Sequence, residues 1–258
     1  MVGIEVVDSH AHLDQVEELE ESLERAGKAG IKIIVAVSTN LESCKKTLRI
    51  AEAHKNNPKI LPALGIHPWD LQAENIEPIL KFIEENLNRA IGIGEVGLDY
   101  WLKGLKKNEE LKSKQQMVFG KFIELSKRFH KPLLIHSRGA WEECLQMVRG
   151  QGVEKAVFHW FSGSLTVLKE LLNEGYYISA SPAAEYSIYH QEAIRHTPIE
   201  RILLETDSPV KYREAVSEPA HAVKSLQAVA KLKNLDVETV ARVTTKNALE
   251  ALGLKGLP

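Results

Sequence analysis

The sequence is poor in cysteine and contains no long apolar run. Its 258 residues include only two cysteines, Cys44 and Cys144, each alone in a helical-looking stretch. Neither a disulfide framework nor a Cys-x-x-Cys metal site is therefore predicted. The longest apolar run covers residues 33–37, far below the roughly 20 residues of a membrane span. The first residues lack the basic region of a signal peptide. We expect a cytoplasmic protein with no membrane partner.

An excess of charge of one sign is also missing. Lys and Arg total 33 and Asp and Glu total 35, which gives a formal net charge of −2. This balance excludes a generally basic nucleic-acid coat, although it leaves room for a local basic patch. Hydrophobic residues at 44% and charged residues at 26% are typical of a globular protein that buries its core without disulfides or a structural metal.

Short β-branched segments alternate with longer amphipathic segments along the whole chain. Leu111, Gln115, Val118 and Phe122 follow one another in steps of four and three, which marks one face of a helix. Val16, Leu19, Leu23 and Ala26 predict an earlier helix, and the segments 226–230 and 237–243 predict two final helices. The expected strands are Ile4–Asp8, Ile31–Ser38, Lys59–Ile66, Ala90–Val96, Pro132–His136, Ala156–His159, Tyr176–Ala180 and Arg201–Glu205.

Eight strands at about 32 residues per strand–helix unit are close to what a (β/α)₈ barrel needs. We therefore predict an α/β fold, a single TIM barrel domain over residues 1–258 with a metal site at its C-terminal mouth. A doubly wound open sheet is the alternative. A doubly wound sheet typically has a Gly-rich phosphate-binding loop after its first strand. This chain has Asp8-Ser-His-Ala-His12 at that position instead. A monomer is the default expectation.

Histidines and carboxylates recur where the expected strands end. They are His10 and His12 after the first strand, His67 after the third, Glu95 in the fourth, His136 in the fifth, His159 in the sixth and Asp207 after the eighth. In a barrel these positions converge at one mouth. Singly, each has an ordinary explanation, such as a hydrogen-bonded core histidine. Four histidines with Glu95 and Asp207, taken together, are the ligand set of a two-metal hydrolase.

Several of these residues are candidates for catalysis as well. Asp207 is placed to accept the proton of an attacking water while it ligates. Arg138 offers a bidentate donor to a phosphate oxygen, or else a salt bridge at the barrel rim. His67 is expected to face the site as a substrate-side or leaving-group residue, with a structural hydrogen bond as the alternative. Surface roles are expected for the histidines in polar helical or loop stretches, which are His54, His130, His190, His196 and His221.

Basic and aromatic residues near the strand ends are candidates for substrate contacts. Trp69, Trp101 and Trp160 could stack on bases, although Trp160 is also a natural packing residue. A modest phosphate track could be formed by Lys103, Lys106, Lys107, Lys112, Lys114, Lys211 and Arg213. A solvated helix face is the alternative meaning of each lysine.

Five motifs resemble those of the TatD family of metal-dependent deoxyribonucleases, which belong to the amidohydrolase superfamily. The chain carries them in the family's order, as Asp8-Ser-His10-Ala-His12, Gly94-Glu95-Val-Gly-Leu-Asp99-Tyr100, Ile135-His136-Ser-Arg138, His159-Trp-Phe-Ser-Gly163 and Glu205-Thr-Asp207-Ser-Pro209. Thr244-Thr-Lys-Asn247 resembles the family's closing helix. The resemblance covers nearly the whole chain. Val216-Ser-Glu-Pro219 departs from the family pattern, in a loop expected to shape the substrate mouth.

The resemblance implies a barrel that holds two divalent cations. His10, His12 and Asp207 would hold one ion, His136 and His159 the other, and Glu95 would bridge them. Imidazole and carboxylate ligands suit Zn, Mn, Fe or Ni, and also Mg with more water in its shell.

The implied function is hydrolysis of phosphodiester bonds by a deoxyribonuclease of the 3′–5′ exonuclease type, acting on single-stranded or 3′-ended DNA. One alternative is hydrolysis of a carboxylic ester or amide, such as an aminoacyl ester on tRNA. Another is a catalytically silent barrel that binds metal or nucleic acid.

Overall fold

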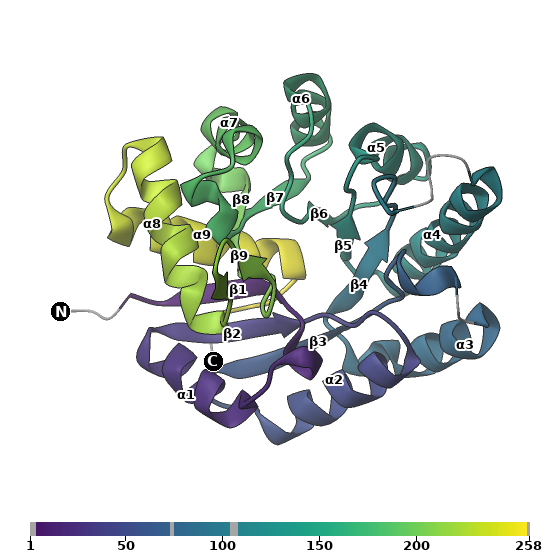
Figure 1. The fold of residues 1–258 in the computed structure, drawn as a ribbon, viewed down its shortest axis with the longest axis horizontal. Coiled ribbons are helices and arrows are strands. Elements are labelled where there is room, and N and C mark those ends of the chain that lie inside the picture. Colours follow the sequence, from purple (N-terminus) through teal and green to yellow (C-terminus); the bar gives the residue numbers. More distant parts are fainter. Residues whose placement is uncertain (1–3, 73–74, 104–107, 257–258) are drawn as a thin grey trace.

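Eight parallel strands follow one another in sequence order around a barrel in the computed structural model, which describes residues 4–72, 75–103 and 108–256 (Figure 1). The strands are β1 (Val6–Ala11), β2 (Ile31–Ala36), β3 (Lys59–Leu64), β4 (Gly92–Gly97), β5 (Leu133–His136), β6 (Ala156–Phe158), β7 (Tyr177–Ala180) and β8 (Ile202–Leu204). The first strand joins the segment after the last one through hydrogen bonds from His12 N to Ser208 O (2.8 Å) and from Asp207 N to His10 O (2.9 Å). The predicted barrel is confirmed.

Helices follow the strands and lie around the outside of the barrel (Figure 1). They are α1 (Leu19–Lys28), α2 (Leu41–Ala53), α3 (Ile76–Asn86), α4 (Glu109–Phe129), α5 (Trp141–Gly150), α6 (Leu165–Asn173), α7 (Ile188–His196), α8 (Ala222–Lys233) and α9 (Val237–Leu252). Several start at a side-chain cap: Asn40, Asn108, Ser164 and Asp236 each accept the backbone N–H three residues on. Such a cap is worth about 1 kcal/mol. No helix among the described residues combines the length and the apolarity needed to cross a bilayer.

The core has two layers because successive strand residues point to opposite faces. In β2, Ile34 belongs to the larger cluster, in which strand residues pack against helix residues such as Phe122 of α4. Its neighbours Ile33 and Val35 belong to a smaller cluster with Leu134 and Leu203 of other strands. Side chains of α9 join this smaller cluster, among them Ala248, Ala251 and Leu252.

The last helix, α9, packs against the beginnings of the first and last strands. Thr245 Oγ1 donates to Glu5 O (2.9 Å), just before β1. Asn247 Nδ2 donates to Ile199 O (2.7 Å) and to Ile202 O (2.9 Å), at the start of β8. The Thr-Thr-Lys-Asn segment therefore holds the end of the barrel opposite the mouth.

The strand boundaries differ from the sequence prediction at the barrel seam. The first strand runs to Ala11 rather than ending at Asp8, so that His10 lies inside it. Its extension follows from the seam hydrogen bonds, which local sequence patterns do not reveal. Val16 precedes α1 and lies outside that helix, which begins at Leu19. Arg201 belongs to the short 3₁₀ turn Ile199–Arg201 instead of β8.

Candidate metal centre

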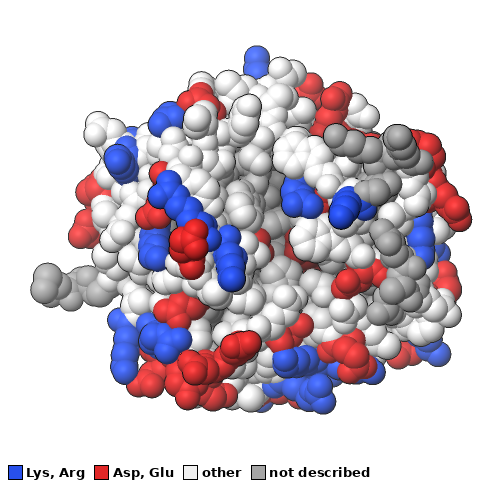
Figure 2. Space-filling model, viewed as in Figure 1, with Lys and Arg blue, Asp and Glu red and all other residues white. Residues whose placement is uncertain are grey.

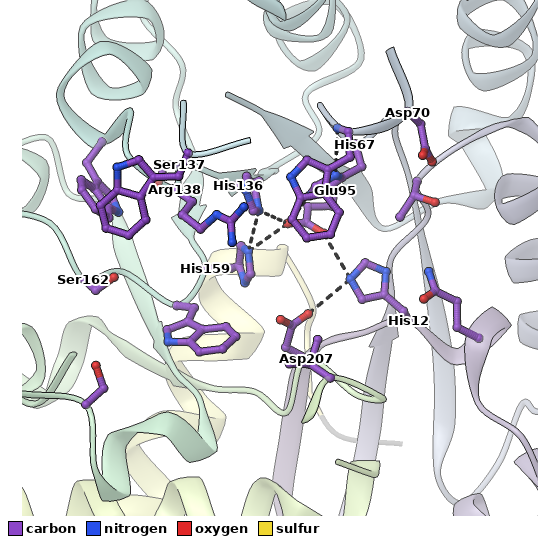
Figure 3. A pocket seen from close by; sticks show the side chains of 18 of the residues that line it. His12, His67, Asp70, Glu95, His136, Ser137, Arg138, His159, Ser162 and Asp207 are labelled. Atoms are coloured by element: carbon purple, nitrogen blue, oxygen red, sulfur yellow. Dashed lines mark hydrogen bonds and ion pairs between the residues drawn. The ribbon is translucent and has the colours of Figure 1, made fainter. Parts of the chain in front are cut away.

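The six predicted ligands and His67 meet at the C-terminal mouth of the barrel. Figure 3 shows all of them except His10. His10 lies in β1, Glu95 in β4 and His136 at the end of β5. His12 and His159 directly follow β1 and β6, and His67 and Asp207 lie three residues after β3 and β8. All seven side chains are buried; they are His10, His12, His67, Glu95, His136, His159 and Asp207. The structure thus brings together the six predicted ligands and His67.

The two oxygens of Glu95 face different pairs of histidines. Glu95 Oε2 lies 3.3 Å from His10 Nε2 and 3.2 Å from His12 Nε2. Glu95 Oε1 lies 2.7 Å from His136 Nδ1 and 2.9 Å from His159 Nε2. One carboxylate therefore contacts both halves of the cluster.

Asp207 belongs to the half that contains His10 and His12. Its Oδ1 atom lies 3.6 Å from His10 Nε2 and 3.3 Å from His12 Nε2. Burial lowers the pKa of His12, but its hydrogen bonds with Asp207 and Glu95 outweigh burial and raise that pKa to about 10. Burial raises the pKa of Glu95, yet the neighbouring histidines hold it well below its usual value. The centre thus strongly favours a positive charge between its carboxylates.

Several nitrogen atoms of the cluster are buried without a hydrogen-bond partner among the described residues. Both ring nitrogens of His10 are in this position, as are His12 Nδ1 and His159 Nδ1. Buried polar groups are rarely left unpaired. Ligand-type atoms lie within 4.8 Å of one another in three groups, which are His10, His12 and Glu95; His67, Glu95 and His136; and His10, His159 and Glu205. Imidazole nitrogens and carboxylate oxygens are metal ligands by type. The residues of this centre fit divalent cations.

Glycines around Glu95 allow the strands to approach closely at the site. A Cβ atom on Gly97, which has φ +140°, would lie 2.0 Å from His136 O. A Cβ on Gly94 would lie 2.6 Å from Leu134 Cβ, and one on Gly65 would lie 2.6 Å from Glu95 O. Side chains at these positions would separate β4 from its neighbours and move Glu95. The Gly-x-Gly-Glu-x-Gly pattern therefore positions the central carboxylate.

Asp99, which lies two residues after β4, was not predicted as a site residue, although its side chain contacts the centre. Its Oδ2 atom accepts hydrogen bonds from His136 Nε2 (2.9 Å), Trp69 Nε1 (2.7 Å) and Arg138 Nε (3.0 Å). Burial raises the pKa of Asp99, but these bonds lower it to about 2. Carboxylates of this kind orient metal-binding histidines.

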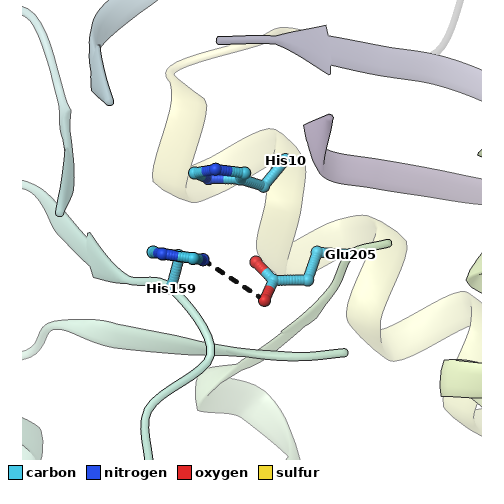
Figure 4. Close-up of side chains that lie close together, drawn as sticks. All are labelled: His10, His159 and Glu205. Carbon is cyan, nitrogen blue, oxygen red and sulfur yellow. Dashed lines mark ion pairs between the residues drawn. The ribbon is translucent and has the colours of Figure 1, made fainter. Parts of the chain in front are cut away.

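Glu205 was also missed, although it precedes Asp207 by two residues. Its Oε1 atom lies 3.5 Å from His159 Nδ1 (Figure 4), whereas Glu95 contacts Nε2 of the same ring. The rings of His10 and His159 stack with centroids 4.1 Å apart. Ser179 Oγ donates to the other oxygen of Glu205. Glu205 therefore faces the second ring nitrogen of His159 at ion-pair distance.

His67 and Arg138 flank the cluster on the Asp99 side. His67 Nδ1 accepts a hydrogen bond from Trp69 N (3.1 Å), and its Nε2 lies 3.5 Å from Glu95 Oε1. The Arg138 guanidinium stacks over the Trp69 ring, 5.1 Å from its centroid. It also forms a salt bridge with Asp99, which is one of the two roles that the sequence predicted for Arg138.

The expectation of a surface role was wrong for His190. This residue is completely buried, and its Nδ1 donates to Phe161 O (2.8 Å) while its Nε2 accepts from Ser181 N (3.1 Å). Burial lowers its pKa. It ties the loop after β6 to the end of β7. His130 and His196 are exposed, and His54 and His221 are half-buried.

A cavity of about 550 Å³ opens above the metal centre. Trp69, Trp101 and Trp160 line it as the sequence suggested, and Trp141, which was not predicted, lines it too. Basic side chains lie on both sides of the hollow at the centre of this face, with acidic ones among them (Figure 2). Arg138 is the basic side chain among the described lining residues.

The expected lysine track is only partly present. Lys112 pairs with Glu109, and Lys114 donates to Leu71 O, so these side chains contact the protein rather than the cavity. Lys103 is exposed, and Lys106 and Lys107 lie outside the described residues. Lys211 and Arg213 are exposed near the hairpin of β9 (Lys211–Tyr212) and β10 (Ala215–Val216).

The loop Val216–Pro219 does not line the cavity, contrary to expectation. Glu218 instead pairs with Arg25 of α1, with 2.7 Å between Oε2 and Nη2. Ser217 Oγ donates to Thr206 O (3.3 Å), next to Asp207. The loop therefore supports the Asp207 segment from behind.

Comparisons with known proteins agree with the geometry of the centre. The sequence model of the family described as TatD related DNase matches residues 7–253. Human deoxyribonuclease TATDN3 is 33% identical over 262 residues, covering 96% of this chain and 94% of the relative. A protein of Buchnera aphidicola named as an uncharacterized metal-dependent hydrolase is 33% identical over 265 residues, covering 96% of each.

The crystal structure of the TatD homologue YJJV from Escherichia coli superposes with a TM-score of 0.88 at 24% identity. The superposition covers 98% of this chain and 100% of that one. It shows that the two chains share the same barrel.

Proposed function

Because this chain belongs to the family of TatD-related DNases, we propose that it removes nucleotides from single-stranded or 3′-ended DNA with two divalent cations bound at the barrel mouth. The chain is a metal-dependent hydrolase of the TatD type. The number of cations, their positions and the preference for a free 3′ end are the proposed parts.

The arrangement around Glu95 supports two cations rather than one. Its Oε2 faces His10 and His12, and its Oε1 faces His136 and His159. Asp207 adds a second carboxylate to the first pair only. Each half thus offers two imidazoles and one oxygen of the shared carboxylate, so that Glu95 would bridge the two ions.

Bound divalent cations supply a water molecule of lowered pKa and neutralise charge on a phosphoryl oxygen. Asp207 would accept the proton of the attacking water as general base, because its carboxylate lies at the edge of the centre that lines the cavity. Glu205 and Asp99 keep the rings of His159 and His136 in place from behind. Rigid ligands avoid reorganisation during the reaction.

Arg138 and His67 would bind the substrate rather than the metals. Arg138 Nε is engaged by Asp99, which leaves the terminal nitrogens of the guanidinium for a phosphate oxygen. His67 Nδ1 accepts from Trp69 N, so the hydrogen of the neutral ring is on Nε2. From there it can donate to a leaving-group oxygen beside Glu95.

The test is hydrolysis of two matched single-stranded oligonucleotides, one with a free 3′ hydroxyl and one with a blocked 3′ end. Chelator-treated protein is assayed with each divalent metal added in turn. Release of mononucleotides from the free 3′ end alone is the expected result. Equal cleavage of both strands would contradict the exonuclease assignment, and release of an amino acid from charged tRNA without DNA cleavage would replace it with ester hydrolysis.

A further inference from the structure

All four tryptophans of the chain line the one cavity above the metal centre. They come from four separate segments of the barrel mouth, after β3, β4, β5 and β6. Trp69 is 48% exposed and Trp101 is 60% exposed. Large aromatic side chains exposed together beside a catalytic centre indicate a binding surface.

The four tryptophans form an aromatic wall of the cavity, and buried Asp99 contacts two of them, Trp69 and Trp101. Its Oδ2 accepts from Trp69 Nε1 (2.7 Å), and its Oδ1 accepts from the backbone N–H of Trp101 (2.9 Å). Since the same carboxylate binds His136, the Trp69 indole and the Trp101 backbone have a fixed position relative to the metal centre. A wall positioned in this way loses little conformational entropy when a ligand binds.

Two glycines leave space for the indoles of Trp101 and Trp141. The rings of Trp101 and Trp141 meet edge to face, with centroids 5.4 Å apart and planes at 90°. A Cβ atom on Gly139 would lie 2.4 Å from Trp101 Cδ1, and one on Gly163 would lie 2.7 Å from Trp141 Cγ. Any side chain at these positions would displace an indole. The two glycines therefore allow the indoles to occupy their observed positions.

We propose that the Trp101–Trp141 pair stacks against an unpaired nucleobase of the substrate, next to the phosphate that is cleaved. The inference rests on the proposed DNase function. A nucleotide carries both an anion and a flat aromatic ring, and the cavity presents Arg138 and the metal centre together with the indoles. Base–indole stacking accepts every base because each has a π-face.

Stacking in this pocket gives a physical reason for a preference for single strands. A base inside a duplex is stacked on its neighbours and paired, and it has to be withdrawn before it can contact the indoles. A terminal or single-stranded base is already accessible. The pocket therefore selects unpaired ends through the base, whereas the metal centre acts on the phosphate.

Tryptophan fluorescence reports on this pocket directly, because every indole of the protein lines it. The probes are dAMP and 2-deoxyribose 5-phosphate, which differ only in the base, titrated into chelator-treated protein. We expect dAMP to bind about tenfold more tightly, as expected from base–aromatic stacking. Trp101→Leu should remove most of that difference.

Two further variants separate stacking from a general loss of structure. Gly163→Ala keeps all four indoles but displaces Trp141, and it should also reduce the preference for dAMP. Met117→Ala removes an exposed side chain of α4 outside the cavity and should leave the preference unchanged. Equal binding of the two probes by the unmodified protein, or an unchanged preference in Trp101→Leu, would overturn the proposal.

Turnover distinguishes a failure of stacking from a failure of the DNase assignment. The metal-loaded protein is given single strands that end in a normal or an abasic 3′ nucleotide. Faster cleavage of the normal strand, with a reduced ratio in Trp101→Leu, supports stacking. Equal cleavage of both strands refutes stacking and leaves the nuclease assignment intact. Cleavage of neither strand refutes the nuclease assignment, and the dAMP titration still decides whether the indoles bind a base.

Discussion

Replacement of Glu95 by glutamine tests whether one carboxylate serves both halves of the metal centre. Both of its oxygens lie within 3.3 Å of two histidine nitrogens each. Glutamine keeps one oxygen and places an amide NH₂ group at the other position. That group donates and cannot ligate. The change also removes the negative charge that both histidine pairs share.

The expected effect is large because metal-based charge stabilisation is worth several kcal/mol. A loss of about 3–4 kcal/mol corresponds to a decrease of roughly 10²- to 10³-fold in kcat. Isothermal titration with the activating metal should show weaker binding at both sites together. The circular dichroism spectrum should be unchanged, because Glu95→Gln preserves the shape of the side chain.

Glu205→Gln is the matched control, since Glu205 is equally buried but forms its ion pair with a single candidate ligand, His159. Loss of an outer carboxylate of this kind costs about 10- to 100-fold in metal affinity, and we expect it at one of the two sites. If Glu95→Gln still binds two ions with unchanged affinity, the bridging role is refuted.

Four further outcomes are expected. Chelation should abolish hydrolysis, and divalent metal should restore it with two ions per chain by metal analysis; full activity with no more than trace metal would contradict the two-ion centre. Asp207→Asn should lower kcat by about 10² or more with an unchanged fold, and near-normal turnover would exclude Asp207 as the base. His130→Ala, at the exposed left-handed end of α4 (φ 51°), should retain full activity and a nearly unchanged free energy of unfolding, because alanine carries the same Cβ atom at this position. Burial raises the pKa of Cys44 to about 11 and also that of Cys144, so iodoacetamide at neutral pH should label both thiols only after denaturation; labelling of the folded protein at the unfolded rate would show that they are accessible.

The sequence alone was enough to predict the barrel and to place six candidate metal ligands at its mouth. The strands of a (β/α)₈ barrel are parallel and all end at one mouth. Residues at the carboxyl ends of the strands are therefore expected to meet at this mouth, even when they are as far apart in the chain as Asp8 and Asp207. The alternation of short apolar strands with amphipathic helices predicted the barrel. Histidines and carboxylates near the strand ends, such as His12 and Glu95, predicted the metal site.

The tertiary structure decided which residues support those ligands and shape the cavity. Asp99 contacts Trp69 and Arg138, which are 30 and 39 positions away. His190 is buried, although its neighbours in the sequence include exposed Tyr189. Such contacts depend on how loops from different strands pack over the mouth. Loop packing is set by side-chain volume and by the pairing of buried polar groups between distant segments, and neither leaves a periodic pattern in the chain.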